Sequence, residues 1–317
     1  MPNGNFIISL DFELHWGAPE EWDLSQRKPY FDATRLSIPK VLSLFSQYHI
    51  RATWATVGFL FAKNKEQLLQ FLPKERPSYL NQELSYYRLI DSGEAGNDES
   101  DDPYHFASSL IEKILETEGQ ELGTHTFAHY YCLENGQNVT QFDLDLKAAQ
   151  AISRENFNTT LRSLVFPRNQ FNPEYLEVAA QNGIKVVRTN PDLWFWKSTS
   201  RFIPLARAVD TLMPISGSTV FHDMKMEKGV QLHKASRFLR PYAEKEKVIR
   251  ELRLKRIFSE MTHAAKTRGN YHLWWHPHNF GYFTKENLVD LERILNHFKM
   301  LNENYGFSSK NMIDLNG

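Results

Sequence analysis

The segment FIISLDFE, residues 6–13, is a short apolar run that ends at two acids. Its β-branched and aromatic residues predict a buried strand. Comparable runs lie at residues 52–58, 121–125, 161–166, 184–189, 218–221 and 271–275. Segments with helical spacing of apolar residues separate most of these runs. Strands that alternate with helices almost from end to end predict an α/β fold with a parallel sheet covered by helices, either a barrel or an open doubly wound sheet.

One long segment differs from the predicted helices in lacking regular periodicity. The helices are expected at residues 36–48, 59–72, 106–118, 141–157, 173–182, 242–266 and 285–301. Residues 73–104 instead contain Pro, Gly, Asn and a cluster of acids. We therefore interpret residues 73–104 as an insertion or excursion between regular elements. No linker clearly divides the chain, so we expect one domain over residues 1–317.

Composition argues against several classes of protein. The chain has 317 residues, 41% of them hydrophobic, which is enough for a large core. Its 37 Lys and Arg residues balance 38 Asp and Glu residues, and this near-neutral charge argues against a nucleic-acid binder. The single cysteine, Cys132, excludes an intramolecular disulfide framework. The chain lacks GxGxxG after the first strand and GxxxxGK[ST] anywhere, so dinucleotide and P-loop sites have no support.

The start of the chain carries no visible targeting segment. It has no basic n-region, and the apolar run over residues 6–10 is too short for a signal sequence or a membrane span. We therefore expect a protein without a transmembrane segment, in a reducing, cytoplasmic setting.

The first of four clusters that could carry chemistry is the acid pair Asp11 and Glu13, at the end of the first strand. The ends of parallel strands face the catalytic side of a barrel. If the extended conformation continues, alternation places both carboxylates on one side. Two such acids could divide the work, one binding a metal and the other abstracting a proton. Taken alone, an acid pair at this place more often has no catalytic role and is simply exposed to solvent at the end of the strand.

The second cluster is the histidine pair His125 and His129, which follows another predicted strand. Spacing of four residues places both imidazoles on one face of a helical turn, where they can bind one divalent ion. An isolated HxxxH is more often two surface histidines. Gly123 and Thr124 favour the metal interpretation, because they predict a tight bend that presents His125.

The remaining clusters centre on Arg168 and His276. Arg168 follows the strand-ending Pro167 and can hold a carboxylate through two hydrogen bonds, or form a structural salt bridge in a loop. His276 emerges from an aromatic strand end and could be a general acid or a core histidine bonded to backbone. Together, two histidines and a carboxylate can form an open metal site, and a second acid, an arginine and a third histidine complete the parts for metal-assisted hydrolysis.

The ordered set of motifs resembles the polysaccharide deacetylase superfamily, also called NodB-homology or carbohydrate esterase family 4. The segment ELGTHTFAH, residues 121–129, is a close match to the family's metal motif. The segments ISLDFE (residues 8–13), ATWATVG (52–58), FPR (166–168), GIKVV (183–187) and LWWH (273–276) resemble the other family motifs in the same order. The acids differ from the usual adjacent Asp pair, since they are two residues apart and the second is Glu. The gap between Asp11 and His125 is unusually long for the family, which predicts an inserted segment of about residues 65–110 after the second β/α unit.

This resemblance implies a distorted (β/α)7 barrel and a divalent metal, most commonly zinc. It implies removal of an N- or O-acyl group, most often acetyl, from a carbohydrate or amino-sugar substrate. His125 and His129 would be metal ligands and Glu13 the acidic ligand, although the roles of the two acids could be exchanged. Asp11 would be the general base, Arg168 would orient it, and His276 would be the general acid.

Aromatic residues could stack on sugar rings, although each is more often part of a core. The candidates for substrate contact are Trp16, Trp194, Trp275 and His278, together with Trp196 and Trp274. Two alternatives to a deacetylase remain open from the sequence. One is another metal-dependent C–N hydrolase on the same scaffold, such as a deformylase or an imide- or ureide-cleaving enzyme, and the other is a catalytically silent carbohydrate-binding barrel.

Overall fold

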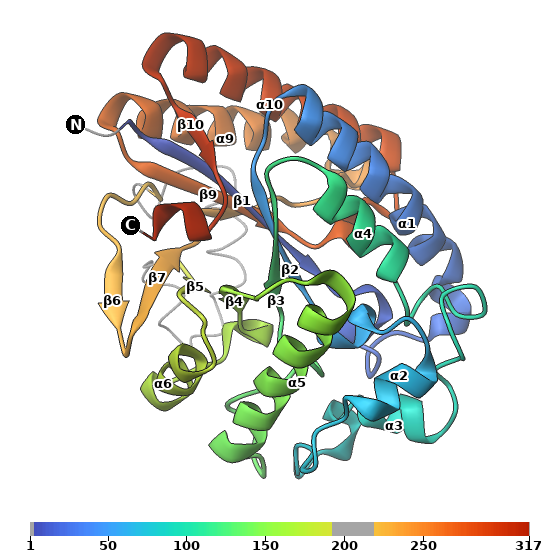
Figure 1. The fold of residues 1–317 in the computed structure, drawn as a ribbon. Helices are drawn as coiled ribbons and strands as arrows, with labels where there is room; N and C mark the ends of the chain where they lie inside the picture. The colour runs from blue at the N-terminus through green and yellow to red at the C-terminus, as the bar shows by residue number, and fades with distance from the viewer. Residues whose placement is uncertain (1–2, 192–218, 317) are drawn as a thin grey trace.

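A ten-stranded, largely parallel sheet forms the centre of the computed structural model, which describes residues 3–191 and 219–316 (Figure 1). Its hydrogen-bonded order is β6-β7-β5-β4-β3-β2-β1-β9-β8, with β10 beside the start of β1. The β6–β7 pair is antiparallel and the other pairs are parallel. The strands are β1 (Asn5–Phe12), β2 (Ala52–Thr56), β3 (Gln120–Thr124), β4 (Ser163–Val165), β5 (Val186–Thr189), β6 (Lys225–Glu227), β7 (Val230–Lys234), β8 (Arg237–Phe238), β9 (Asn270–Trp275) and β10 (Ser308–Lys310).

The sheet curves toward a barrel but is not closed. The backbone N–H of Ala235 donates to Thr189 at the end of β5, and the next N–H, of Ser236, donates to His272 on β9. Two consecutive residues between β7 and β8 therefore bond to β5 on one side and to β9 on the other, which are the two parts of the sheet that a closed barrel would join. The predicted α/β fold with a parallel sheet is confirmed, in the form of a distorted (β/α) barrel with an open sheet.

Helices cover the outside of the sheet (Figure 1). Helices α1, α9 and α10 pack along one flank, and α5 packs against α6 along another. The helices are α1 (Leu24–Gln47), α2 (Lys65–Gln70), α3 (Tyr87–Asp91), α4 (Ser108–Glu116), α5 (Val139–Phe157), α6 (Pro173–Gln181), α9 (Lys247–Thr267) and α10 (Thr284–Tyr305). Over the described ranges, no helix combines the length and the apolar character that a bilayer span requires.

Local sequence explains where several helices begin. Asn138 caps α5 by accepting from the backbone N–H of Gln141, whose side chain returns to the Asn138 N–H. Asn172 caps α6, and Pro173 occupies the first helical position, where its missing N–H costs nothing.

The two faces of β1 divide the apolar core from the barrel interior. Phe6, Ile8, Leu10 and Phe12 belong to the main hydrophobic cluster beneath the helices. The alternate residues Ile7, Ser9 and Asp11 face the other way, because successive strand side chains point to opposite faces. Ser9 and Asp11 meet Arg188 of β5 in that interior, so the inside of the barrel is partly polar.

Most predicted elements lie within a few residues of the observed ones, with three differences. Residues 59–72 do not form one helix, since a 3₁₀ turn over Gly58–Phe61 ends before Asn64, which caps the separate helix α2. The helix expected at 36–48 begins twelve residues earlier, at Leu24. Within residues 218–221, Phe221 makes only an isolated bridge to Asn270, and Ser218 lies outside the described residues.

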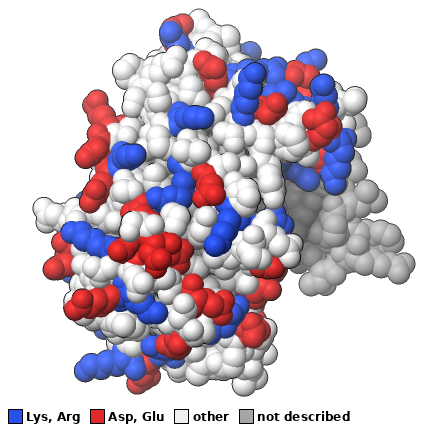
Figure 2. Space-filling model, turned by 90° about the vertical axis from the view of Figure 1, so that its right-hand side faces the viewer, with Lys and Arg blue, Asp and Glu red and all other residues white. Residues whose placement is uncertain are grey.

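The segment expected as an insertion contains a 3₁₀ turn over Gln82–Leu84 and the short helix α3. Its aromatic residues Tyr86 and Tyr87 are buried, so this segment packs into the domain rather than extending from it. On the face drawn in Figure 2, Lys and Arg side chains are interspersed with Asp and Glu, in line with the balanced composition.

Candidate metal centre

A cleft at the carboxyl ends of the strands collects most of the predicted site residues. Asp11 ends β1, His125 follows β3, Arg168 follows β4 and His276 follows β9. The cleft is lined by Asp11, Glu13, Gly17, Ala18, Glu21, Trp22, His125, His129, Tyr131, Phe166, Arg168, Asn169, Trp274, His276 and His278. Segments more than 260 residues apart in sequence thus meet at one edge of the sheet, as expected for an active site of an α/β barrel.

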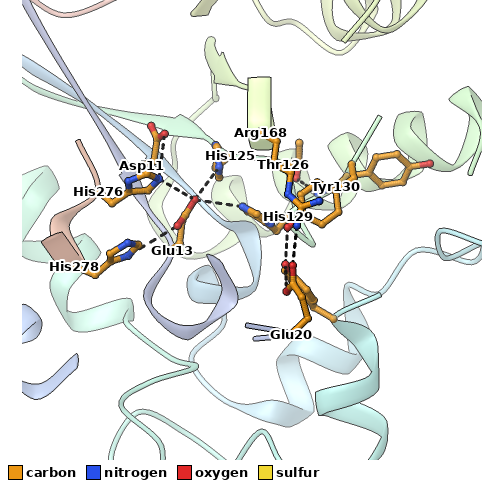
Figure 3. A network of polar contacts seen from close by, with 12 residues as sticks. Asp11, Glu13, Glu20, His125, Thr126, His129, Tyr130, Arg168, His276 and His278 are labelled. Carbon is orange, nitrogen blue, oxygen red and sulfur yellow. Dashed lines mark hydrogen bonds and ion pairs between the residues drawn. The ribbon is translucent and has the colours of Figure 1, made fainter. Parts of the chain in front are cut away.

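Glu13, His125 and His129 form the compact core of this cleft (Figure 3). The Nε2 atoms of His125 and His129 lie 3.0 and 3.3 Å from the same oxygen, Oε1 of Glu13. Potential ligand atoms of the three residues all lie within 4.8 Å of one another, and the three residues are buried. Among the described residues, this is the one group of three or more such side chains with metal-binding spacing.

The loop that carries both histidines is not helical, so the prediction of one helical turn is wrong. Thr126 and His129 have left-handed φ values of 65° and 55°. The buried Asp145 of α5 holds the loop by accepting from the backbone N–H groups of Phe127 and Ala128, at 2.7 and 3.0 Å. The Thr126 hydroxyl accepts from the N–H of Tyr130 at 2.6 Å. These side chain–backbone bonds replace the helical bonds, and both imidazoles still converge.

Neighbouring residues make room for the Glu13 carboxylate and support the histidines. A Cβ at Gly17 would collide with Oε2 of Glu13, so a larger residue at this position would displace the carboxylate. The His129 ring stacks on Tyr86 from the inserted segment, with ring centroids 5.5 Å apart. Tyr86 in turn hydrogen-bonds Tyr131 at 2.6 Å and Glu20 at 2.7 Å. The inserted segment therefore packs directly behind a candidate ligand.

The protonation of Glu13 and His129 suits a cation. Burial acts to raise the pKa of Glu13, but the charge of His276 and hydrogen bonds from His125 and His129 hold that pKa well below its ordinary value. Burial lowers the pKa of His129 to about 4, against the opposing pull of Glu13. An ionised carboxylate and a neutral imidazole are the forms that bind metals.

The donor set fits a divalent metal. One carboxylate and two imidazoles are typical ligands of zinc and other transition metals and leave coordination positions for water and substrate. The Nδ1 atoms of His125 and His129 are buried without a hydrogen-bond partner among the described residues. The ring orientation thus comes from packing and from the loop backbone rather than from a side-chain acceptor behind each ring.

Asp11 is held by Arg188 rather than by Arg168, which corrects the sequence prediction. Nη1 and Nη2 of Arg188 each donate to one Asp11 oxygen at 2.7 Å, and the guanidinium lies over the Trp274 ring at 4.2 Å. Burial opposes ionisation of Asp11, but the charges of Arg188, His125 and His276 outweigh it and lower the Asp11 pKa. One signal in the sequence was overlooked, because Arg188 is a charged residue inside the apolar strand 184–189.

Arg168 lies instead on the rim of the cleft. It pairs with Glu20 at 2.9 Å and with Glu134 at 3.5 Å, and its guanidinium covers the Tyr131 ring at 4.2 Å. Arg168 and Asn169 both have left-handed φ values, of 53° and 51°, and this turn directs Arg168 sideways along the rim (Figure 3).

Two histidines that follow β9 face the carboxylates (Figure 3). Nε2 of His276 lies 3.8 Å from both Asp11 Oδ2 and Glu13 Oε1, and a quarter of the His276 side chain is exposed. The buried His278 stacks on His276 at 4.8 Å, and its Nδ1 lies 3.9 Å from Glu13 Oε2. Burial lowers the His278 pKa to about 3, so this ring is neutral.

The predicted tryptophan contacts are corrected in part. Trp16 and Trp275 are both fully buried in the hydrophobic cluster, which leaves neither ring open to a substrate. Trp194 and Trp196 lie outside the described residues. The aromatic residues that line the cleft and are partly exposed are Trp22 and Trp274. Trp274 and Trp275 both lie at the end of β9. Their position in the sequence therefore could not show that Trp274 lines the cleft while Trp275 packs in the hydrophobic cluster.

Comparison with known proteins identifies one sequence family. A family model described as "Polysaccharide deacetylase" matches residues 30–187, which contain His125 and His129 but not Asp11, Glu13 or His276. No curated protein sequence matches the chain.

Solved structures share the fold at low sequence identity. A candidate polysaccharide deacetylase from Mycobacterium smegmatis is 11% identical, with a TM-score of 0.57 over 100% of this chain and 91% of that chain. The α-amylase AmyC from Thermotoga maritima is 11% identical, with the same TM-score of 0.57 over 99% and 74% of the two chains. A branching enzyme from Pyrococcus horikoshii is 12% identical, with a TM-score of 0.53 over 98% and 69%. These likenesses concern the fold alone.

Proposed function

Because the chain belongs to the polysaccharide deacetylase superfamily, we propose that it is a metal-dependent hydrolase that removes an N-acyl group, with acetyl the expected group, from an amino sugar or glycan. The observation that carries this proposal is the convergence of Glu13, His125 and His129, whose ligand atoms lie within 4.8 Å of one another beside Asp11 and His276.

Glu13, His125 and His129 are the residues that would hold the metal, with zinc the expected ion. When bound, a divalent metal supplies Lewis-acid polarisation of the acyl carbonyl and lowers the pKa of water to about 7. The ionised Glu13 and the neutral His129 are ready for this role without a further proton loss.

Asp11 serves as the general base in this proposal. It faces the same cleft as the metal residues and is ionised, because Arg188 offsets the cost of burial. The two bonds from Arg188 also limit rotation of the carboxylate, so that its direction toward an attacking water is fixed before substrate binds.

His276 serves as the general acid. Its Nε2 lies 3.8 Å from Asp11 and from Glu13, and it is the more exposed of the two histidines beside them. Protonation of the leaving amine is needed for C–N cleavage, and a positioned acid contributes roughly 100- to 10,000-fold. The buried, neutral His278 is less suited to donate this proton, and it supports the His276 ring by stacking.

Glycosidic bond cleavage, which the amylase-like fold brings to mind, finds less support in this cleft. A glycosidase needs two carboxyl groups placed on either side of the scissile bond. Glu13 lies between two imidazoles and is assigned to the metal in this proposal. The further carboxylate that lines the cleft, Glu21, is exposed on the rim.

An assay of acetate and formate release from a series of N-acyl amino sugars tests the proposal. We expect metal-loaded protein to release one of these acids and chelated protein to release none. His125→Ala and His129→Ala should each lose bound metal and activity together, whereas His263→Ala, at an exposed histidine of α9, should lose neither. Full hydrolysis by a metal-free His125→Ala/His129→Ala protein contradicts the proposal, and formate release alone identifies a deformylase instead.

The general acid is tested separately. His276→Ala should keep its bound metal while kcat falls by roughly 100-fold or more. Wild-type turnover in this variant would remove His276 from the reaction but leave the metal centre in place.

A further inference from the structure

A second polar cluster lies in the barrel interior, one layer below Asp11. Ser9, Arg188, His233 and His272 come from β1, β5, β7 and β9, and the exposed fraction of each is 1% or less. Ser9 precedes Asp11 by two residues on the same face of β1, and Arg188 pairs in register with His233. The proposed reaction uses only Arg188 of this set.

Hydrogen-bond donors and acceptors in this cluster can be assigned from its geometry. Nη1 of Arg188 lies 3.0 Å from Ser9 Oγ, and Nε2 of His272 lies 2.8 Å from the same oxygen. A guanidinium can only donate, so Ser9 accepts from Arg188. The Ser9 hydroxyl proton then needs an acceptor of its own, and buried hydroxyl groups rarely remain unpaired. His272 Nε2 is the acceptor in place, at 2.8 Å, which assigns the ring proton of His272 to Nδ1. Nδ1 is buried and has no partner among the described residues, but the reverse tautomer would leave both Nδ1 and the Ser9 hydroxyl proton unpaired.

We propose that His272 is a positioning residue, which accepts the Ser9 hydroxyl proton at Nε2 and thereby orients Ser9 to hold the guanidinium of Arg188 against Asp11. This inference rests on the proposed function, because Asp11 must act as the base for its position to affect turnover. His272 itself does not touch the cleft, since it is buried one layer below.

The charges around His272 favour a neutral ring. Burial holds the pKa of His272 well below its ordinary value, and the charges of Arg188 and His233 act in the same direction. A neutral imidazole can accept a proton from Ser9 without repelling the guanidinium. An apolar side chain in place of His272 would leave the Ser9 hydroxyl proton without an acceptor. A cationic side chain there would repel the Arg188 guanidinium.

The Ser9 contact completes the pairing of one guanidinium nitrogen. Nη1 of Arg188 carries two protons, and it donates one to Asp11 at 2.7 Å and one to Ser9 at 3.0 Å. Arg188 Nε has no hydrogen-bond partner in the described part of the chain, so Ser9 and Asp11 alone define the rotation of the guanidinium by hydrogen bonds. If Ser9 turns away, a second N–H of a buried cation is left unpaired, and the direction of Asp11 is less well defined.

His233 offers a matched control within the same layer. It is as buried as His272, but neither of its ring nitrogens has a hydrogen-bond partner among the described residues. Substitution of His233 therefore tests the effect of removing a buried imidazole, whereas substitution of His272 also removes the Ser9 acceptor.

Kinetics of three variants test the positioning role. His272→Leu should lower kcat by about 10- to 100-fold with KM and bound metal unchanged, because a small misplacement of a catalytic group can cost about 100-fold. His272→Gln keeps an acceptor near the Nε2 position and should recover most of the loss. His233→Leu should stay within about threefold of the wild type. An equal loss in the two leucine variants, or no recovery with glutamine, overturns the proposal.

Ser9→Ala provides the same test if His272→Leu does not fold. It should lower kcat to a similar extent, and the double variant Ser9→Ala/His272→Gln should be no slower than Ser9→Ala alone, because both changes act on one contact. Additive losses in the double variant contradict the proposed chain from His272 through Ser9 to Arg188.

The tautomer of His272 gives a readout that is independent of activity. The ¹⁵N chemical shifts of the ring should show a proton on Nδ1 in the wild-type protein, and Ser9→Ala should remove this preference. A proton on Nε2 overturns the inference even in an active enzyme. A protein that hydrolyses none of the acyl sugars but shows the Nδ1 tautomer contradicts the proposed function and leaves the hydrogen-bond assignment correct.

Discussion

The candidate metal centre and the rim of the cleft use similar residue types in opposite ways. The Nε2 atoms of His125 and His129 both contact one oxygen of Glu13, and all three residues are buried. Arg168, two-fifths exposed on the rim, is shared between two carboxylates, Glu20 and Glu134. In the buried cluster, the ligand atoms of the three residues point to a common position. On the rim, the charge of Arg168 is already balanced by Glu20 and Glu134. Convergence on one point, rather than residue type, separates a site that can bind an ion from a structural salt bridge.

The two arginines beside the cleft extend this comparison. Arg188 is almost fully buried and makes two bonds to Asp11, whereas Arg168 makes longer, more exposed contacts with side chains that the proposed reaction does not use. A buried, two-bond ion pair positions a group far better than an exposed pair.

Matched lysine substitutions at the two arginines should give the largest contrast. Arg188→Lys keeps the positive charge but loses the paired bonds, so we expect kcat to fall on the order of 100-fold with bound metal retained. Arg168→Lys should remain within about threefold of the wild type. Steady-state kinetics with metal analysis measures both, and equal losses would mean that rim and interior contribute alike to the reaction.

The pH dependence of folding should single out Asp145, the carboxylate behind the histidine loop. Burial raises the pKa of Asp145 to about 7 in the folded protein, from an ordinary value of 3.8. Its stabilising contribution is therefore complete below about pH 4 and is lost as the pH rises toward 7, by up to about 1.4 kcal/mol per pH unit. Denaturant unfolding of metal-free protein should show this decline in the wild type relative to Asp145→Asn.

The sign of that difference is the critical result. A wild-type protein that gains stability relative to Asp145→Asn between pH 4 and 7 would mean that the bonds from Phe127 and Ala128 outweigh burial. The same measurement at Asp11 should give the opposite slope, because Arg188 lowers the pKa of that carboxyl group and the stabilisation is lost only in acid.

The smallest effect is expected from removing the charge on the rim. Arg168→Met should change the free energy of unfolding by no more than about 1 kcal/mol, because partly exposed ion pairs contribute little. Thermal unfolding at low and high salt measures this effect. A loss of several kcal/mol would show that the rim cluster supports the fold as strongly as the buried pair does.

The sequence predicted those parts of the molecule that local patterns determine. The apolar runs located β1, β2, β3, β5 and β9, and the motif around His125 and His129 located two members of the candidate metal centre. The strands β6 and β8 were missed, because two or three residues at an edge carry no detectable alternation. The five-residue strand β7, inside the sheet, was missed as well. The helical turn expected for the histidine pair was wrong, since spacing alone cannot show that Asp145 replaces the helical hydrogen bonds.

Residue partners across the barrel could not be predicted in the same way. The motif order suggested Arg168 as the partner of Asp11, but the left-handed turn at Arg168 and Asn169 sends that side chain to the rim. The partner is Arg188, 177 residues away from Asp11 along the chain. Such pairings depend on strand order and on the direction of each side chain, which become known only from the folded sheet.

The pairing of β1 with β9 has a consequence for how the protein is made. The strand that carries Asp11 is synthesised first, but its neighbour and His276 emerge from the ribosome only after some 260 further residues. Until then the side of β1 that pairs with β9 has unpaired backbone, and the first half of the chain must wait for β9. If the proposed function holds, hydrolytic competence is acquired in a single late step of biosynthesis, and a ribosome that stalls before residue 270 releases a polypeptide that holds both histidines of the pair but lacks His276.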